Sequence, residues 1–393
     1  MRARRVMAIF GTRPEAIKVA PVLKLLERSR LFRPVTVVTG QHREMLAQVL
    51  DLFSIVPDHD LGILEPRQTL TAVTTRALEG LAPLMESERP DVVLVQGDTT
   101  TTFAGALAAF YNQVPVVHLE AGLRTGNPYS PFPEEVNRRL TSELTALHLA
   151  PTLGNKANLV AENVDPARIL VTGNTVVDAL HQAARLNGDY GDPALDRLDD
   201  DPRCVVLVTA HRRESWGAPL AAVGSALAEI ARSDPDLLVV FPIHRNPAVR
   251  ETILLAVAGL PNVLVVEPLS YAGFVRLMNR AHVILTDSGG IQEEGPCLGK
   301  PVLVMRDTTE RPEAVAAGSV ELVGTDTARI VSAVRRLLDD ELAYRQMATA
   351  VNPYGDGRAA ERAVAALAHL FGLGPLPEEF SPELPRLTEL AAA

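Results

Sequence analysis

Short runs of Val, Ile and Leu recur along the chain, and each is followed by a turn and by a stretch with helical spacing of apolar residues. Such runs are typical of strands that are buried on both faces of a parallel sheet. One series predicts strands at residues 5–10, 35–39, 92–95 and 114–119, and a second series predicts them at 205–209, 237–241, 263–266, 283–286 and 302–305. This alternation of strands with helices predicts an α/β protein with parallel sheets.

The two series of strands indicate two domains. A chain of 393 residues exceeds the size at which a single hydrophobic core keeps growing. Residues 187–203, between the two series, are dense in Asp, Gly and Pro and predict a surface loop. We expect two Rossmann-like domains facing a central cleft. The expected parts are a first domain at 1–173, a hinge at 172–175, a second domain at 174–356, a helix at 357–371 that packs back on the first domain, and a flexible tail at 372–393.

Composition narrows the class of protein. A hydrophobic fraction of 47% and a charged fraction of 22% are typical of a soluble globular chain, and a net charge of -10 argues against non-specific binding to nucleic acid. Cys204 and Cys297 are far apart in sequence and predict neither a disulfide nor a thiolate metal site. The apolar run at 6–10 is too short for a signal peptide, and no run approaches the roughly 20 apolar residues of a spanning helix. The sequence therefore predicts a cytoplasmic protein without a membrane partner.

Familiar cofactor motifs are missing from the sequence. Where a dinucleotide-binding protein has GxGxxG after its first strand, this chain has GTRPEAIK. The segment GPCLGKP is similar to a phosphate-binding Walker motif, but Glu294 replaces its first Gly and Pro301 replaces the Ser or Thr that holds magnesium. Neither GxSxG nor HExxH occurs. We therefore expect no nicotinamide, flavin, nucleotide or metal cofactor.

Charged residues in the first half of the chain follow the predicted strands directly. Arg13 and Lys18 follow the strand at 5–10, and the carboxylates of Asp98 and Glu120 follow two later strands. Ligands of parallel sheets bind at this end of the strands, so these side chains are candidates for one site. Each cluster also has a structural alternative: a capped helix start for Arg13 and Lys18, an N-cap for Asp98, a buried pair with Arg124 for Glu120, and an acidic first turn for Glu134.

The second half of the chain repeats this arrangement. His211 and Arg212 follow one predicted strand and His244 follows the next, which suggests an anion clamp or an acid/base site. In LTDSGGIQEEG, at 285–295, a strand, a glycine turn and a helix start favour an anion. Glu293 and Glu294 fall in the first turn of that helix and should repel a phosphate. We interpret Glu293 as a solvated first-turn residue.

Seven of these clusters together resemble one family. They are GTRPE, QGDTTT, HLEAGLRT, TGNT, TAHRRE, TDSGGIQEE and RDTTERPE. In this order and spacing, from residue 5 to about residue 370, the chain is similar to the non-hydrolysing UDP-N-acetylglucosamine 2-epimerases of bacteria. The resemblance implies the glycosyltransferase-B type fold, and it implies interconversion of UDP-N-acetylglucosamine and UDP-N-acetylmannosamine without an added cofactor. The implied route is anti elimination of UDP to 2-acetamidoglucal, followed by return of UDP to the opposite face.

The resemblance also implies roles for individual residues. Asp98, Glu120 and Glu134 match the carboxylates that share proton transfer, and His211 matches a residue that touches the diphosphate and helps protonate it. Glu294 matches the residue that binds the ribose hydroxyls, and Phe274 lies where a side chain faces the uracil. The remaining matches to the UDP site are Arg13, Lys18, Ser288, Gly289, Gly290 and Arg311.

Relatives in this family often bind a second UDP-N-acetylglucosamine as an activator and are commonly dimers through the first domain. The positions that match this second site are Gln41, Glu44, Arg67, Gln68, Glu134, Arg212 and His244. One position departs from the pattern, because some relatives carry Gln where this chain has Glu44. A carboxylate facing a bound sugar nucleotide would weaken that contact.

Three other functions remain open from the sequence. A glycosyltransferase of the same fold would also bind a UDP-sugar, although three carboxylates favour proton chemistry at the sugar. A hydrolysing epimerase would release free N-acetylmannosamine and UDP. A non-catalytic sensor of sugar nucleotides would keep the phosphate loop without needing the carboxylates.

Overall fold

The chain folds into two compact units. The computed structural model describes residues 2–40, 43–65, 68–186, 188–212 and 216–382. The first unit is formed by Met1–His181 together with Tyr354–Pro382, and the second is formed by Gln182–Pro353. The division falls within helix α7 (Thr175–Arg185), several residues after the expected start of the second domain at 174.

A parallel sheet of seven described strands forms the centre of the first unit, in the order β3-β2-β1-β4-β5-β6-β7. The strands are β1 (Arg4–Phe10), β2 (Phe32–Val38), β3 (His59–Asp60), β4 (Val92–Gln96), β5 (Val116–Leu119), β6 (Leu147–Ala150) and β7 (Ile169–Val171). Ile9 of β1 lies in register with Val37 of β2 and Val95 of β4, and all three are buried. Strand order reverses between β1 and β4, and open α/β sheets bind ligands at such a point.

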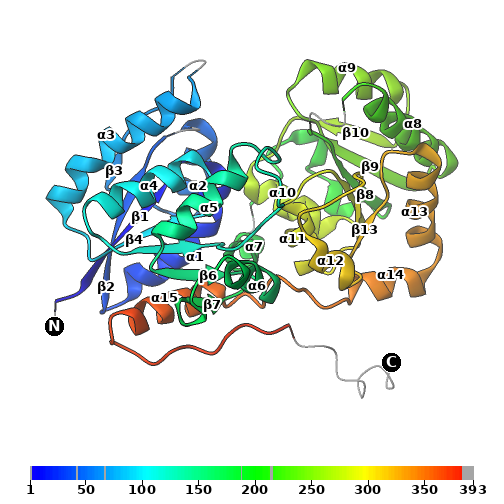
Figure 1. Ribbon diagram of the computed structural model, residues 1–393. Helices are drawn as coiled ribbons and strands as arrows, with labels where there is room; N and C mark the ends of the chain where they lie inside the picture. Colours follow the sequence, from blue (N-terminus) through cyan, green and yellow to red (C-terminus); the bar gives the residue numbers. More distant parts are fainter. Residues whose placement is uncertain (1, 41–42, 66–67, 187, 213–215, 383–393) are drawn as a thin grey trace. The chain divides into compact units, whose positions relative to one another are not determined.

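Helices cover both faces of this sheet (Figure 1). They are α1 (Arg13–Arg28), α2 (Arg43–Leu52), α3 (Leu70–Glu88), α4 (Thr100–Tyr111), α5 (Glu134–Leu144), α6 (Leu153–Ala161), α7 (Thr175–Arg185) and α15 (Ala359–Leu370). Helix α1 packs against α2 and α15, whereas α4 packs against α3 and α5. The expected helix at 357–371 is therefore present as α15, and it lies on the first unit.

The second unit repeats the same winding with six described parallel strands, in the order β10-β9-β8-β11-β12-β13. The strands are β8 (Cys204–Thr209), β9 (Leu237–Pro242), β10 (Val263–Val266), β11 (Val283–Thr286), β12 (Val302–Val304) and β13 (Val320–Leu322). The helices are α8 (Ala218–Ser233), α9 (Pro247–Ala256), α10 (Tyr271–Arg280), α11 (Ile291–Cys297), α12 (Pro312–Ala316), α13 (Thr327–Asp339) and α14 (Glu341–Ala348). Here the strand order reverses between β8 and β11. The carboxyl ends of these two strands are therefore the position at which such a sheet binds ligands.

All nine predicted strands are present, with ends shifted by no more than a few residues. Four further strands were not predicted: β3, β6, β7 and β13. These have only two to four residues each, and His148 of β6 and Glu321 of β13 interrupt their apolar pattern. Such short runs carry too little periodicity to be distinguished from loops.

The sequence predicts that the Asp-rich segment at 187–203 is a surface loop. In the structure, part of this segment is buried. Tyr190, Leu195 and Leu198 are buried, and the loop contains two short 3₁₀ turns. The guanidinium of Arg276, on α10, lies over the Tyr190 ring at 4.6 Å and bonds to Asp199. The loop therefore holds α10 in place.

The described part of the C-terminal tail is attached to the edge strand β7 (Figure 1, red). The backbone N–H of Phe380 donates to Val171 O at 2.8 Å, and the N–H of Val171 donates to the Glu379 carboxylate at 3.0 Å. Lys156 also binds Glu379, at 2.7 Å, and Phe380 is buried. Within the predicted tail at 372–393, Glu379 and Phe380 are thus bound to the first unit. These contacts cover a strand edge that would otherwise present unpaired backbone groups.

The two chain segments that connect the units meet in the first unit. The N–H of Asn174 donates to Tyr354 O at 2.6 Å, and the Asp178 carboxylate accepts the N–H groups of Ala359 and Ala360 at the start of α15. Burial raises the pKa of Asp178 to about 6, although these N–H donors oppose the shift.

In the described ranges, no helix is both long and apolar enough to cross a bilayer.

Replacing Phe380 by Ala tests whether the tail is anchored by this one side chain. Loss of a buried Phe costs about 3 kcal/mol, which corresponds to roughly a hundredfold rise in the fraction of released tail. Cleavage after Glu378 and Glu379 by a glutamate-specific protease should accelerate by that factor when opening is fast relative to cleavage. Leu376→Ala is the matched control, because Leu376 is 59% exposed and should leave the rate unchanged. Equal rates for the two variants would contradict the anchoring role.

Candidate functional site

The buried carboxylate of Glu15 joins the two loops at the reversal point of the first sheet. One oxygen accepts the N–H groups of Gly11 and Thr12 at 2.9 and 2.8 Å, in the loop after β1. The other accepts the hydroxyls of Thr99 and Thr102 at 2.5 and 3.0 Å, at the start of α4. Glu15 therefore fixes the spacing between the ends of β1 and β4.

Local sequence explains how Glu15 reaches this position. Thr12 and Glu15 form a capping box, in which the Glu side chain returns to the N–H of the cap residue. Burial raises the pKa of the Glu15 carboxyl, and the hydroxyl and N–H donors lower it by less. The sequence interpretation of a capped helix start is correct for α1, and the same cap supports the loop that carries Arg13.

Glu120 follows β5 and has an unusual backbone conformation. Its φ of 60° lies in the left-handed region, which non-glycine residues rarely adopt. Lys18 on α1 donates to the Glu120 carboxylate at 2.5 Å, Gln96 donates to its other oxygen, and Asn174 donates at 3.3 Å. The alternative of a structural pair with Arg124 does not hold, because Arg124 binds Glu162 at 2.7 Å. Backbone strain together with converging donors is typical of a functional carboxylate.

Asp98 is paired with Arg138, and Glu134 lies close enough to both for their charges to act on it. The guanidinium of Arg138 binds the Asp98 carboxylate at 2.7 Å, and Asn137 donates to the Asp98 carbonyl at 3.0 Å. Asp98 is not the cap of α4, because Thr99 accepts the N–H of Thr102 there. Glu134 is the first residue of α5, and its pKa is raised by burial and by the charge of Asp98. The protonated form of Glu134 is therefore favoured relative to an ordinary Glu.

The neighbouring Glu135 has a different task from Glu134. Its carboxylate is fully buried and accepts the N–H groups of Thr125 and Gly126 at 3.0 and 3.1 Å. Burial alone would raise the pKa of Glu135, but these donors and Arg138 lower it below its usual value. Glu135 thus stabilises the loop before α5, and Glu134 is the more accessible of the two acids.

The two cations predicted for phosphate binding in the first unit have different surroundings. Lys18 is paired with Glu120. Arg13 begins α1 and is half-buried, and within the described residues its side chain has no hydrogen-bond or ion-pair partner. Arg13 is therefore the more available cation for an anion at the carboxyl ends of β1 and β4.

The loop Ser288–Gly290 after β11 lies between two guanidinium groups. A methyl group on the Cα of Gly289 would lie 3.5 Å from Arg212 and 3.5 Å from Arg311. Arg212 also donates to Asp287 O at 3.1 Å, which ties it to this loop. The arrangement combines backbone N–H groups at a helix start with two cations, and it favours a phosphate or diphosphate.

The sequence interpretation of Glu293 as a solvated residue is wrong. Glu293 is buried, and its carboxylate accepts the Nε–H of Arg311 at 2.8 Å. A carboxylate in the first turn of α11 therefore orients the cation that faces Gly289. The sequence could not show this contact, because Arg311 follows 18 residues later on a separate loop.

Glu294, in contrast, is held from helix α10. The hydroxyl of Tyr271 donates to its carboxylate at 2.9 Å, and the other carboxylate oxygen lies 4.0 Å from where a methyl group on Gly290 would be. Phe274 lies one turn after Tyr271 and is half-buried. The proposed ribose and uracil residues thus belong to two helices in contact. Tyr271 was missed by the sequence reasoning, although it lies in the same helix start as Phe274.

His211 and Asp287 form a further pair at the reversal point of the second sheet. The Nδ1 atom of His211 lies 2.7 Å from Asp287 Oδ1. Asp287 was not predicted as a site residue, although it precedes Ser288 directly. His244 follows β9, and its ring centre lies 6.2 Å from that of His211.

Only some residues of the expected activator site can be placed. Arg212 and His244 lie near His211 and the Ser288–Gly290 loop. Gln68, which precedes α3, accepts the N–H of Glu65 at 3.2 Å. Gln41, Arg67 and the side chain of Glu44 fall outside the described part of the chain.

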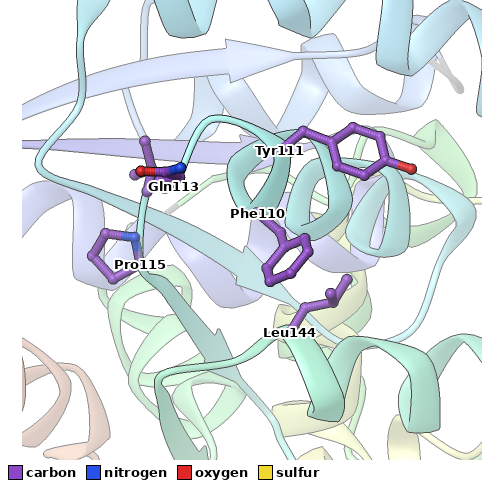
Figure 2. A pocket seen from close by; sticks show the side chains of 6 residues that line it. Phe110, Tyr111, Gln113, Pro115 and Leu144 are labelled. Atoms are coloured by element: carbon purple, nitrogen blue, oxygen red, sulfur yellow. The ribbon is translucent and has the colours of Figure 1, made fainter.

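An open pocket of about 600 Å³ lies elsewhere on the first unit (Figure 2). Phe110, Gln113, Pro115 and Leu144 line it, near the amino end of β5. It is therefore at the opposite end of the sheet from Glu120.

No cluster of three or more His, Cys, Asp or Glu side chains among the described residues has the arrangement of a metal site.

Two doubly wound α/β units with charged clusters at their strand ends define an enzyme of the glycosyltransferase-B type fold. The family model described as UDP-N-acetylglucosamine 2-epimerase matches residues 24–368. The chain belongs to the UDP-N-acetylglucosamine 2-epimerase family, and it is an isomerase.

Individual relatives agree with this assignment. The UDP-N-acetylglucosamine 2-epimerase of Escherichia coli K12 is 54% identical over 368 residues, which cover 92% of this chain and 98% of that protein. The solved structure of the enzyme from Neisseria meningitidis bound to UDP-GlcNAc is 47% identical, with a TM-score of 0.85 over 93% of this chain and 100% of that one. The Methanocaldococcus jannaschii enzyme in complex with UDP-GlcNAc and UDP is 32% identical, with a TM-score of 0.77 over 93% and 99%.

Two substitutions at Glu15 test how the loops after β1 and β4 are held. Glu15→Ala leaves the buried N–H groups of Gly11 and Thr12 without their acceptor and should cost about 3 to 5 kcal/mol. Glu15→Gln keeps one acceptor oxygen, and its amide can donate to the two Thr hydroxyls, so it should cost only about 1 kcal/mol. Hydrogen exchange of peptides from β1 and β4 measures the loss of stability in both variants. Equal losses for Ala and Gln would show that the hydrogen bonds are not what holds the loops.

Proposed function

We propose that this chain interconverts UDP-N-acetylglucosamine and UDP-N-acetylmannosamine by anti elimination and re-addition of UDP. The observation that carries the proposal is the grouping of Asp98, Glu120 and Glu134 in the first unit, beyond what nucleotide binding requires. Solved relatives with UDP-GlcNAc and UDP support a UDP-sugar substrate.

The chemistry explains why carboxylates are needed. The proton on carbon 2 of the sugar is not acidified by a carbonyl, so inversion requires either transient oxidation or loss of the leaving group. Elimination needs a base for that proton, stabilisation of the departing diphosphate, and an acid that returns a proton to the other face. Asp98, Glu120 and Glu134 share these transfers in our proposal. Burial and the charge of Asp98 raise the pKa of Glu134, which favours its protonated form.

The second unit supplies the diphosphate and nucleoside contacts in this proposal. The N–H groups of Ser288–Gly290 and the Ser288 hydroxyl donate hydrogen bonds to the diphosphate, and Arg311 and His211 also contact it. Glu294, already oriented by Tyr271, binds the ribose hydroxyls, and Phe274 faces the uracil. Arg13 and Lys18 complete the phosphate contacts from the first unit.

A second UDP-N-acetylglucosamine acts as an activator in this proposal. It would contact the surroundings of Gln68, Arg212 and His244, together with Glu134. The carboxylate of Glu44 weakens this contact, so activation should be smaller than in relatives that carry Gln there. In this proposal the enzyme is cytoplasmic, and its product is used for the synthesis of cell-surface polysaccharide.

A homodimer through the first unit completes the proposal. Helices α4 and α5 pack together, and they expose large apolar side chains around the pocket of Figure 2. Phe110 and Tyr111 are 57% and 69% exposed, and Leu140 is 44% exposed. Exposed apolar side chains gathered on one pair of helices are typical of a protein interface.

Transfer of deuterium from solvent tests the reaction. In heavy water and without an acceptor, the recovered UDP-sugar should carry deuterium at carbon 2, because the proton is removed and returned. Asp98→Asn should lower this exchange by a factor of about 10² to 10⁴ and leave UDP affinity nearly unchanged. Asp91→Asn is the matched control. Asp98 follows the carboxyl end of β4, whereas Asp91 lies at its amino end and binds Arg4 at 2.9 Å. It should keep normal exchange.

The outcomes separate the alternatives. UDP-sugar recovered without deuterium would contradict the epimerase proposal and favour a glycosyltransferase. Free N-acetylmannosamine accumulating in step with UDP would indicate a hydrolysing enzyme, and no turnover would indicate a sensor. Starting from UDP-N-acetylmannosamine with and without added UDP-N-acetylglucosamine tests activation in the same assay.

The oligomeric state is tested by light scattering on the purified chain. The wild type should have twice the mass of one chain. Replacing both Phe110 and Tyr111 by Ser should give the mass of one chain, because the apolar contact is lost. Leu255→Ser, on α9 of the second unit, is the control: Leu255 is 82% exposed and should leave the dimer intact. A wild-type monomer would contradict the proposal.

A further inference from the structure

His211 and Asp287 are placed together by neighbouring strands of the second sheet. Thr209 of β8 and Thr286 of β11 lie in register. Asp287 follows Thr286 directly, and His211 comes two residues after Thr209. Nδ1 of His211 is 2.7 Å from Oδ1 of Asp287. The His211 side chain is 42% exposed, whereas that of Asp287 is 1% exposed. The ring is thus held on its inner edge and open on its outer edge.

The second oxygen of Asp287 is used differently. Oδ2 accepts the backbone N–H groups of His211 and Arg212, at 2.7 and 2.8 Å. The backbone N–H of Asp287 donates in turn to Thr209 O at 3.3 Å. One oxygen therefore fixes the loop after β8, and the other is left for the imidazole.

The charge of Asp287 decides which ring nitrogen carries a proton. Burial would raise the pKa of this carboxyl, but His211 and the two N–H donors lower it below its usual value. Asp287 is thus ionised at neutral pH and can only accept hydrogen bonds. The Nδ1 atom of His211 must then carry the hydrogen, and in the neutral ring Nε2 keeps its lone pair.

The neighbouring His244 has the opposite arrangement. The backbone N–H of Asn246 donates to His244 Nδ1 at 3.2 Å, so that nitrogen must be the acceptor. Burial and the nearby His211 lower the pKa of His244, which favours its neutral form. Its hydrogen therefore lies on Nε2. Two histidines with ring centres 6.2 Å apart thus differ in tautomer because of their different partners.

We propose that Asp287 is a positioning residue that fixes the tautomer of His211, so that Nε2 faces the diphosphate and exchanges a proton with it. The proposal rests on the proposed function, in which the Ser288–Gly290 loop next to Asp287 holds the diphosphate. When UDP departs, Nε2–H of the protonated ring gives its proton to a diphosphate oxygen, and the neutral ring regains a proton from that oxygen when UDP returns. Asp287 stays ionised throughout and touches no substrate.

Asp287→Asn tests the proposal without removing the loop contacts. Two backbone N–H groups face one side of residue 287, and they should orient the Asn oxygen toward themselves. The amide NH₂ then faces His211 and requires Nδ1 to accept. The ring should change to the tautomer with hydrogen on Nε2, and the chain should still fold.

The measurement is the ¹⁵N spectrum of histidine-labelled protein, with the His211 signals assigned by their loss in His211→Asn. Wild type should show hydrogen on Nδ1 for His211 and on Nε2 for His244, and Asp287→Asn should show Nε2 for both. Turnover should fall by a factor of about 10³ or more, as expected when a general acid/base is held in the wrong tautomer, with KM changed by less than about threefold. Asp326→Asn, an exposed cap of α13 in the same unit, is the matched control and should change neither quantity.

The results separate this inference from the proposed function. A neutral His211 ring with its hydrogen on Nε2 and none on Nδ1 in the wild type would overturn the inference even if every variant failed to fold, as would an unchanged tautomer in Asp287→Asn. A tautomer change with normal turnover would also overturn it, because the ring would then take no part. Normal turnover in His211→Asn would instead remove His211 from the proposed function.

Discussion

Several charges at the ends of the strands are held by an opposite charge or by directed donors, because an unpaired charge at this depth would be costly. Glu15 joins β1 to β4, and Asp287 joins β8 to β11. The same need pairs Lys18 with Glu120 and Arg311 with Glu293. Carboxylates therefore orient Lys18 and Arg311 before an anion binds. This lowers the entropic cost of ordering these two cations on binding.

Much of the fold follows from the hydrophobic pattern. Strands buried on both faces of a parallel sheet form continuous apolar runs, so the long central strands of both units could be predicted. The short strands β6 and β7 could not, because their pairing depends on β5 already being in place. The same reason applies to the tail, since the binding of Phe380 depends on an edge strand that the sequence does not reveal.

The positions of the candidate site residues could be predicted better than their partners. Strand ends place Asp98 and Glu120 at one edge of the sheet, and a parallel sheet makes that placement general. Ion-pair partners arise from separate loops, so neither Lys18 with Glu120 nor Glu293 with Arg311 could be predicted. Glu15 is an exception, because the capping box from Thr12 to Glu15 is visible in the sequence. Its link to Thr99 required the fold.

The first unit is assembled from two segments that lie on either side of the second unit in sequence, and this has a consequence during synthesis on the ribosome. Helix α15 and the segment at Phe380 belong to the first unit but are made after the second unit. Until they emerge, the face of α1 that α15 covers and the edge of β7 stay open. The second unit is continuous in sequence, so its fold can be complete while the unit that began first still waits for its closing segment.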